Sequence, residues 1–167
     1  ADVVLATSTP LTIALPGVYA ARRRKAPMVF EVRDVWPAVP IAMGVLSNPI
    51  LVMLSRLLER WAYRHAAAVI VLAPGMKDAV CQHGIERDRV HVIPNGCDFD
   101  IFANPAIERV TLPGAGAGRS VLYMGAMGVA NGVEYIPRLA AALARQTSRQ
   151  PVHFYLAGDG SRRASAE

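Results

Sequence analysis

Short apolar runs alternate along this chain with longer segments in which apolar residues recur at helical spacing. Four runs are each followed by polar, proline or glycine residues, as expected of buried strands that end in a turn: residues 3–6, 26–32, 67–73 and 90–93. The segments between them predict helices at residues 11–25, 49–65 and 74–84. The pattern then resumes with a strand, a helix and a strand at residues 120–128, 132–146 and 152–160. This alternation predicts an α/β fold built on parallel sheets.

Local signals refine the expected helices. Asn48 is expected to cap the helix of residues 49–65, with Pro49 at its first position. Thr9 is expected to cap the helix at residues 11–25 in the same way. The aliphatic face of the helix at residues 50–63 is expected to pack mainly in the core, with contact to a membrane as the alternative. Residues 33–43, rich in proline, predict a loop.

The pattern loosens between residues 97 and 118. The stretch "LPGAGAGRS", residues 112–120, predicts a surface connection before a second unit. We therefore expect one domain at residues 1–97, followed at residues 98–167 by a linker and the first strand–helix–strand of another domain.

Polar and glycine residues collect where the expected strands end. These positions are residues 7–10, 33–37, 73–76, 94–98, 125–128 and 158–160. In doubly wound sheets, ligands bind at the carboxyl ends of the strands. The adjacent cation and anion of "VFEVRDVWP", Arg33 and Asp34, are thus expected at the rim of a crevice and not in the core.

The formal net charge of +5 is concentrated at residues 22–25 and 162–163. The basic run at residues 22–25 has two explanations: the solvated end of a helix, or a contact with an anionic lipid or substrate that would make membrane attachment sensitive to salt. Nucleic-acid binding is not expected, because no aromatic residues interleave with these cations. The two cysteines, Cys81 and Cys97, form no disulfide framework, which favours a cytoplasmic location, either free or peripheral on the inner face of the plasma membrane.

Six stretches, in order and at family-like separations, resemble the GT-B glycosyltransferases of family 4. They are "DVVLATSTP", "VFEVRDVWP", "LERWAYRHAAAVIVLAPGMK", "VHVIPNGCD", "VLYMGAMGVANGVE" and "FYLAGDG". The resemblance is greatest to the bacterial branch that transfers sugars onto lipid-linked surface glycans. It implies two incomplete Rossmann-like domains in this chain, the first on the acceptor side and the second binding the nucleotide sugar.

The resemblance also implies roles for residues of the first domain. Asp34 is expected to orient or deprotonate the acceptor hydroxyl, and Arg33 to hold a phosphate or carboxylate. The alternative is a structural Arg–Asp pair or a loop aspartate bonded to its own backbone. Thr7, Ser8 and Trp36 are expected on the acceptor side. Asn95 and Gly96 are expected to form a hinge that also lines the cleft.

In the second domain, the loops after both strands are expected to bind the donor diphosphate through their backbone. The residues are Gly125, Gly128, Asn131, Gly132, Gly158, Asp159 and Gly160. Ala126 and Asn131 stand where the family often has arginine and lysine, a departure shared by relatives that use UDP-N-acetyl sugars. An ordinary tight turn is the alternative for each loop.

The expected activity is retaining sugar transfer from a nucleotide sugar, UDP-linked by preference, to a glycan or polyprenyl-linked acceptor. No metal or other cofactor is expected, because no cysteine or histidine spacing fits a metal site. No glutamate has a second glutamate eight positions later, so the family's Glu-x7-Glu donor segment is missing from this sequence. The competing expectation is therefore a non-catalytic fragment that binds nucleotide sugar or a partner. A UDP-sugar epimerase ranks last, because its acidic and histidine pattern is absent.

Overall fold

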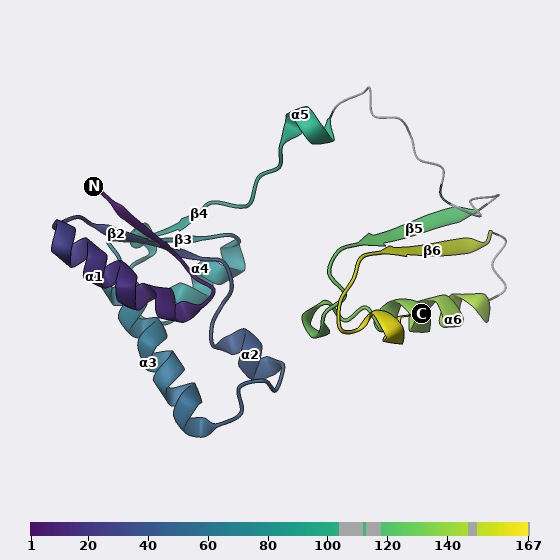
Figure 1. Ribbon diagram of the computed structural model, residues 1–167, viewed down its shortest axis with the longest axis horizontal. Coiled ribbons are helices and arrows are strands. Elements are labelled where there is room, and N and C mark those ends of the chain that lie inside the picture. The colour runs from purple at the N-terminus through teal and green to yellow at the C-terminus, as the bar shows by residue number, and fades with distance from the viewer. Residues whose placement is uncertain (104–111, 113–117, 147–149, 167) are drawn as a thin grey trace. The chain divides into compact units, whose positions relative to one another are not determined.

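The computed structural model describes residues 1–103, 112, 118–146 and 150–166, which form two compact units. The first unit is Ala1–Phe102 and the second is Ala103–Glu167 (Figure 1). The expected surface connection at residues 112–120 lies mostly outside the described residues.

The first unit contains β1 (Val4–Thr7), α1 (Ala14–Arg24), β2 (Met28–Val32), α2 (Ala38–Ala42), α3 (Pro49–His65), β3 (Ala68–Val71), α4 (Pro74–Cys81), β4 (Val90–Val92) and α5 (Phe99–Phe102). The second contains β5 (Arg119–Met124), α6 (Tyr135–Ala144) and β6 (Val152–Ala157).

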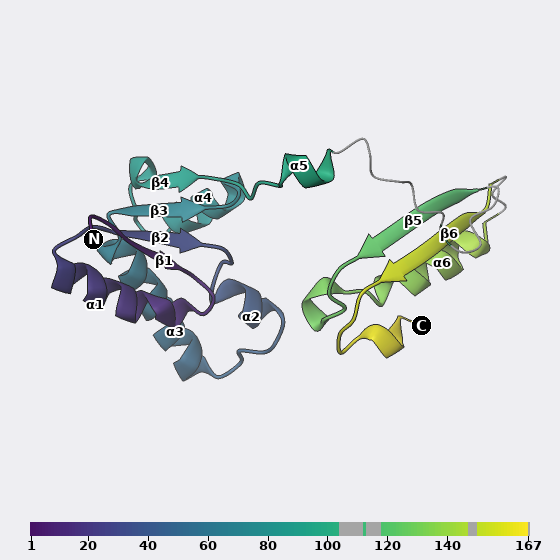
Figure 2. The same ribbon diagram turned by 45° about the horizontal axis from the view of Figure 1, so that its top comes forward.

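Four parallel strands in the order β1-β2-β3-β4 form the sheet of the first unit (Figure 2). The strands are short and rich in β-branched residues, which suit a pleated surface. Alternate side chains, including those of Met28, Phe30 and Val32 in β2, are buried, while their neighbours are only partly covered. The core therefore lies on one side of the sheet, where it meets α1, α3 and α4.

Close packing of α1 on the sheet explains Gly17. A Cβ atom at this position would lie 2.9 Å from the Cβ of Ala6 in β1, so a larger residue would push the helix away. Pro16 lies in the first turn of α1, where a missing N–H costs no helical bond. Residues 22–24 form the exposed last turn of α1, a favourable position for cations.

The amino terminus of α3 is capped as expected. The Asn48 side chain accepts hydrogen bonds from the N–H groups of Ile50 and Leu51 at 2.9 and 3.4 Å, and Pro49 occupies the first turn. The second half of α3 packs on the core through Ala62 and Tyr63.

Two local expectations were wrong. Residues 33–43 are not all loop, because α2 occupies Ala38–Ala42, with the proline at position 40 buried. Thr9 does not cap the following helix: Pro10 takes the cap position and makes no side-chain bond to the helix, while the Thr9 hydroxyl bonds elsewhere.

The aliphatic face of residues 50–63 is also only partly core. Five apolar side chains in its first half are more than half exposed: Ile50, Leu51, Met53, Leu54 and Leu57. The turns that follow sit against α1 and the sheet, whereas this amino-terminal end of α3 lies away from the sheet (Figure 1).

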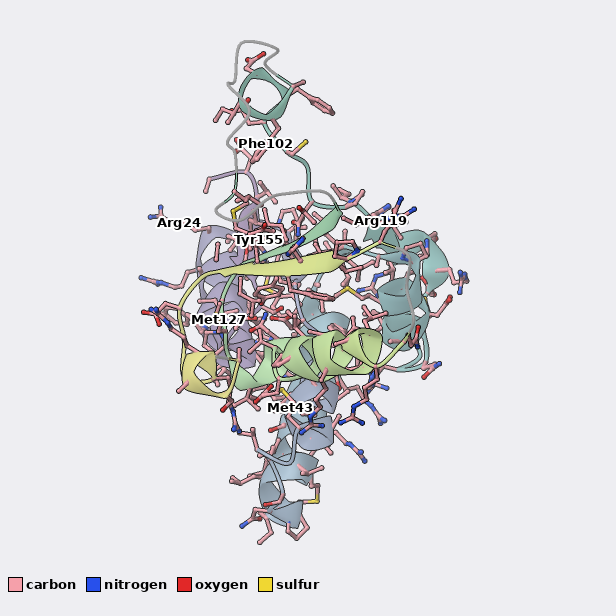
Figure 3. All side chains as sticks on the ribbon, turned by 90° about the vertical axis from the view of Figure 1, so that its right-hand side faces the viewer. Arg24, Met43, Phe102, Arg119, Met127 and Tyr155 are labelled. Carbon is pink, nitrogen blue, oxygen red and sulfur yellow. The ribbon has the colours of Figure 1, made fainter. Side chains whose placement is uncertain are left out.

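The second unit is also built from parallel strands that are connected through a helix, but it is smaller. β5 and β6 pair in parallel from Arg119 opposite Val152 to Met124 opposite Ala157, and α6 packs on β6. The helix begins at Tyr135, later than the expected 132, because Gly132 has a left-handed φ of 58° that an α-helix cannot include. Among the described residues of this unit, Met127, labelled in Figure 3, and Val133 are buried.

The two parallel sheets with their crossover helices confirm the expected α/β class. Among the described residues, no helix is both long and apolar enough to cross a bilayer.

Candidate functional site

Ser8 joins the carboxyl ends of β1 and β2. Its side chain is buried, and its hydroxyl oxygen accepts a hydrogen bond from the backbone N–H of Arg33 at 3.0 Å. Its own N–H donates to the carbonyl of Glu31 at 2.7 Å. Ser8 thereby extends the pairing of the two strands by one step and fixes the place where the loop after β2 begins.

Asp34 lies directly beyond this point, exposed at the rim. Its carboxylate accepts a hydrogen bond from the Thr9 hydroxyl at 3.0 Å, and its backbone carbonyl accepts from the N–H of Trp36 at 2.9 Å. Thr9 has a φ of 108°, a conformation that few residues other than glycine adopt. Two loops that follow neighbouring strands thus hold one carboxylate at the open end of the sheet.

Arg33 turns to a different neighbour. Its guanidinium lies 3.5 Å from the side-chain oxygen of Asn95, at the upper limit for a hydrogen bond. Asn95 follows β4, so the guanidinium reaches across the end of β3 to a third loop. Arg33 and Asp34 therefore do not form the ion pair with each other that was the structural alternative, because each side chain contacts another residue. Gly96 is exposed beside Asn95, with open space where a Cβ would lie.

The other two acceptor-side candidates are less well placed for contact with a ligand. The Trp36 indole is half-buried and packs against the hydrophobic core, so it shapes the loop. Thr7 ends β1 opposite Glu31 and is half-buried. The structure therefore brings together Ser8, Arg33, Asp34 and Asn95. Thr9 joins them, although the sequence predicted it as a helix cap and only as one of the residues at the strand end.

The two glycine loops of the second unit lie against each other. The N–H of Gly125 donates to the carbonyl of Ala157 at 3.0 Å, and the N–H of Met127 donates to the carbonyl of Asp159 at 2.8 Å. A Cβ on Gly158 would stand 1.9 Å from the carbonyl oxygen of Gly125. Since Gly158 also has a φ of 159°, no other residue fits this contact without displacing the backbone.

The remaining donor candidates surround this pair of loops. Asn131 accepts a hydrogen bond from the N–H of Gly128 at 3.3 Å, and Gly132 turns the chain with a φ of 58° just before α6. The Asp159 carboxylate accepts from the N–H of Gly160 at 2.8 Å and lies 4.0 Å from Arg163. Asp159 is therefore partly engaged in holding its own turn, the structural alternative named for it above.

A buried polar cluster in the first unit escaped the sequence prediction. The Glu59 carboxylate is 3% exposed, accepts a hydrogen bond from the Tyr63 hydroxyl at 3.0 Å and lies 3.5 Å from the Nε2 atom of His83. Burial raises the pKa of Glu59 to about 7, although Tyr63, Arg56 and Arg60 oppose the shift. Burial also lowers the pKa of His83.

A signal for this cluster was present in the sequence. Glu59 and Tyr63 are four residues apart in α3, on the side of the helix that also carries Ala62. The sequence therefore places a carboxyl group on the side of the helix that faces the core. The cluster borders a cavity of about 430 Å³ that is also lined by Val35 and Pro37, from the loop of Asp34. Among the described residues, no group of three or more histidine, cysteine or acidic side chains is placed to hold a metal ion.

Comparison with known proteins identifies a family for the first unit. The family model described as "glycosyl transferase 4-like domain" matches residues 1–96, more than half of the chain and nearly all of the first unit. No curated protein matches the chain significantly.

Proposed function

Because this chain belongs to the glycosyl transferase 4-like family, we propose that it forms part of a retaining glycosyltransferase of GT-B type. In this proposal the first unit holds the acceptor and the second holds a nucleotide sugar. The donor is UDP-linked, and the acceptor is a lipid-linked or surface glycan of a bacterium. The observation that carries the proposal is the pair Asp34 and Arg33 at the carboxyl edge of the sheet, inside the matched region.

Asp34 is proposed to act on the acceptor. Its carboxylate accepts the proton of the attacking hydroxyl while the acceptor oxygen forms its bond to the anomeric carbon. The bond between that carbon and the donor diphosphate breaks on the same face of the sugar, which retains the configuration, and the diphosphate leaves with the electron pair. The Thr9 hydroxyl, 3.0 Å from the carboxylate, orients it for this step. Arg33 supplies a planar cation to a phosphate or carboxylate of the substrates.

The second unit is proposed to stabilise the diphosphate as charge develops on it. The loops at residues 125–132 and 158–160 carry further backbone N–H groups besides those of Gly125, Met127, Gly128 and Gly160, which donate within the unit. The helix α6 begins just after the first of these loops. Ala126 and Asn131 leave the first loop without a cationic side chain, which supports a donor whose diphosphate is bound mainly by backbone groups. No cofactor and no metal are part of this proposal.

The test has two stages. Titration of the ¹⁵N-labelled chain with UDP should shift the amide signals of residues 125–132 and 158–160, while UMP should shift them less, because it lacks the second phosphate. Transfer from UDP-N-acetylglucosamine to a polyprenyl-diphosphate sugar should then be retaining and should need Asp34. Binding of UDP without transfer would favour the second candidate, a nucleotide-sugar-binding fragment. No shift in either loop would remove the proposed donor site.

A further inference from the structure

The cavity of about 430 Å³ beside Glu59 lies between α2, α3 and the carboxyl end of α4. Its apolar wall includes Val35, Pro37 and Ile41, and its polar side includes Gln82 and His83 from the end of α4. The volume lies within the range of small-molecule sites, roughly 300–1,000 Å³. The side chains proposed to act on the acceptor do not line it, so this cavity is a separate feature of the first unit.

Two arginines flank Glu59 along the side of α3 that borders the cavity. Arg56 and Arg60 both line it and are four residues apart, which makes their guanidinium groups neighbours on the helix surface. Both lower the pKa of Glu59 and of His83, so their positive charge acts inside the cluster. The ion pairs formed within the described part of the chain involve neither arginine. Their charges are therefore left for a molecule that enters the cavity.

One oxygen of the Glu59 carboxyl group opens on the same space. The Oε1 atom accepts the hydrogen bond from Tyr63 and is the oxygen nearest His83. The Oε2 atom has no hydrogen-bond partner among the described residues, although every fully enclosed side-chain oxygen or nitrogen of those residues has one. Oε2 is therefore not fully enclosed, and the cavity that Glu59 lines is the space it faces. A carboxyl oxygen in such a place needs a partner from outside the protein.

The charged groups around the cavity favour an anion. Arg56 and Arg60 contribute two positive charges, and Glu59 is the one acidic side chain that lines the space. Burial lowers the pKa of His83 and raises that of Tyr63, so both are neutral near pH 7. The lining residues of α2, of the loop before it and of α4 carry no charge. The cavity is thus positive whether or not Glu59 is ionised.

We propose that this cavity binds a small phosphate ester that carries hydroxyl groups, with Arg56 and Arg60 at the phosphate and Glu59 at a hydroxyl. A phosphate presents several oxygens, so it contacts two guanidinium groups at once, which a single carboxylate does less well. The free Oε2 atom of Glu59 accepts from a hydroxyl group. The apolar wall then covers the carbon atoms of the ligand. The proposal goes beyond sugar transfer and does not depend on it, because binding here involves no turnover.

Titration of the ¹⁵N-labelled 167-residue chain with glycerol 3-phosphate near pH 7 tests the site. The amide signals of residues 35–41, 56–60 and 79–83 should shift together, and those of residues 125–132 and 158–160 should not. Two related compounds separate the contributions of the ligand's groups. Glycerol, which lacks the phosphate, and ethyl phosphate, which lacks the hydroxyl groups, should each bind at least about tenfold more weakly.

Variants with matched charge locate the binding groups. Arg56→Gln with Arg60→Gln should weaken glycerol 3-phosphate binding roughly 10- to 100-fold, because it removes two charged hydrogen-bond donors. Arg23→Gln with Arg24→Gln makes the same change of charge at exposed positions of α1 and should alter binding by less than about twofold. Ala79→Leu fills the cavity without changing its charge and should abolish binding. Circular dichroism should confirm that each variant is folded.

The pH dependence of anion binding tests the part played by Glu59. Inorganic sulfate is the probe, because its charge is constant from pH 6.5 to 8.5. Glu59 ionises in this range, and its carboxylate then repels the anion, so sulfate should bind about three- to tenfold more weakly at the upper end. Glu59→Gln should remove this change. The pKa of His83 lies below its usual 6.5, so His83 stays neutral throughout.

Four results would overturn the proposal. The first is the absence of amide shifts around the cavity. The second is unchanged binding in the Arg56→Gln and Arg60→Gln variant, or an equal loss in the α1 control, which would show attraction by overall charge alone. The third is glycerol binding as tightly as glycerol 3-phosphate. The fourth is the same pH dependence of sulfate binding in Glu59→Gln as in the wild-type chain.

Discussion

The hydroxyl group of Thr9 lies 3.0 Å from a carboxylate oxygen of Asp34, although the two residues belong to loops that follow different strands. The contact exists because β1 and β2 are parallel neighbours and therefore end at the same edge of the sheet. A hydroxyl donor fixes the orientation of the carboxylate without neutralising it. Asp34 thus remains able to accept a proton or a hydrogen bond from another molecule.

Replacing Asp34 should separate chemistry from folding. Asp34→Ala should lower the rate of sugar transfer by at least about 100-fold if the carboxylate is the catalytic base. Because the side chain is exposed, the free energy of unfolding should change by no more than about 0.5 kcal/mol. Steady-state transfer assays and urea titrations would measure the two effects. Asp88→Ala, an exposed aspartate elsewhere in the first unit, is the control, and near-normal turnover of Asp34→Ala would remove this residue from the mechanism.

The buried carboxylate of Glu59 should make the stability of the first unit depend on pH. Its pKa rises from 4.5 in the unfolded chain to about 7 in the folded one, so the folded state favours the protonated acid. Its contribution to stability is therefore complete below about pH 4.5 and is lost as the pH rises through about 7. One pKa unit corresponds to about 1.4 kcal/mol, so the loss amounts to at most about 3–4 kcal/mol.

Comparison with Glu59→Gln isolates this effect, since His83 shifts in the opposite sense and is present in both proteins. The variant should gain in relative stability between pH 5 and pH 8, as measured by urea titrations that follow tryptophan fluorescence. Glu86→Gln, an exposed glutamate of the same unit, should show the wild-type pH dependence. A constant difference between Glu59→Gln and wild type across this range would contradict the raised pKa.

The contact between Gly158 and Gly125 should make the second unit intolerant of a side chain at position 158. Gly158→Ala would place a Cβ 1.9 Å from the Gly125 carbonyl oxygen and should destabilise this unit by about 2–4 kcal/mol. Faster hydrogen–deuterium exchange in β5 and β6 would report the loss. Both tryptophans, Trp36 and Trp61, belong to the first unit, so their fluorescence should not change.

Gly128→Ala is the matched control for this prediction. Position 128 has a φ of −95°, and the nearest atom to an added Cβ is the end of the Asn131 side chain at 3.2 Å. This change should cost less than about 1 kcal/mol, because a flexible side chain can move aside. Equal effects of the two substitutions would show that the Gly125–Gly158 contact is not the constraint.

The cap of α3 gives a prediction about folding alone. Asn48→Ala removes the acceptor of two backbone N–H groups and should lower the free energy of unfolding of the first unit by about 1 kcal/mol. Ser47→Ala, one residue earlier and exposed, should have little effect. Urea midpoints of the two variants provide the measurement, and a smaller loss for Asn48→Ala than for Ser47→Ala would contradict the role of the cap.

Short-range sequence patterns predicted most of the helices and strands. Strand runs, the Asn48 cap and the carboxyl-end placement of Arg33 and Asp34 all follow from periodicity and turn residues, which act over a few positions. The partners of Thr9 and Ser8 could not be predicted, because both contacts cross 25 residues and depend on the register of β1 with β2. The assignment of α3 to the core was right for its second half and wrong for its first half, because periodicity identifies an apolar helix but not how far its neighbours extend along it.

The one-sided core of the first unit has a practical consequence for handling the protein. Parallel sheets in proteins are normally covered on both sides, yet Leu5 in β1 is 62% exposed, and Val29, opposite it in β2, is only partly covered. At the concentrations used for crystallisation or NMR, this exposed apolar side of the sheet should favour reversible self-association. Light scattering should therefore rise with protein concentration, and polar replacement of Leu5 should improve solubility at little cost to folding.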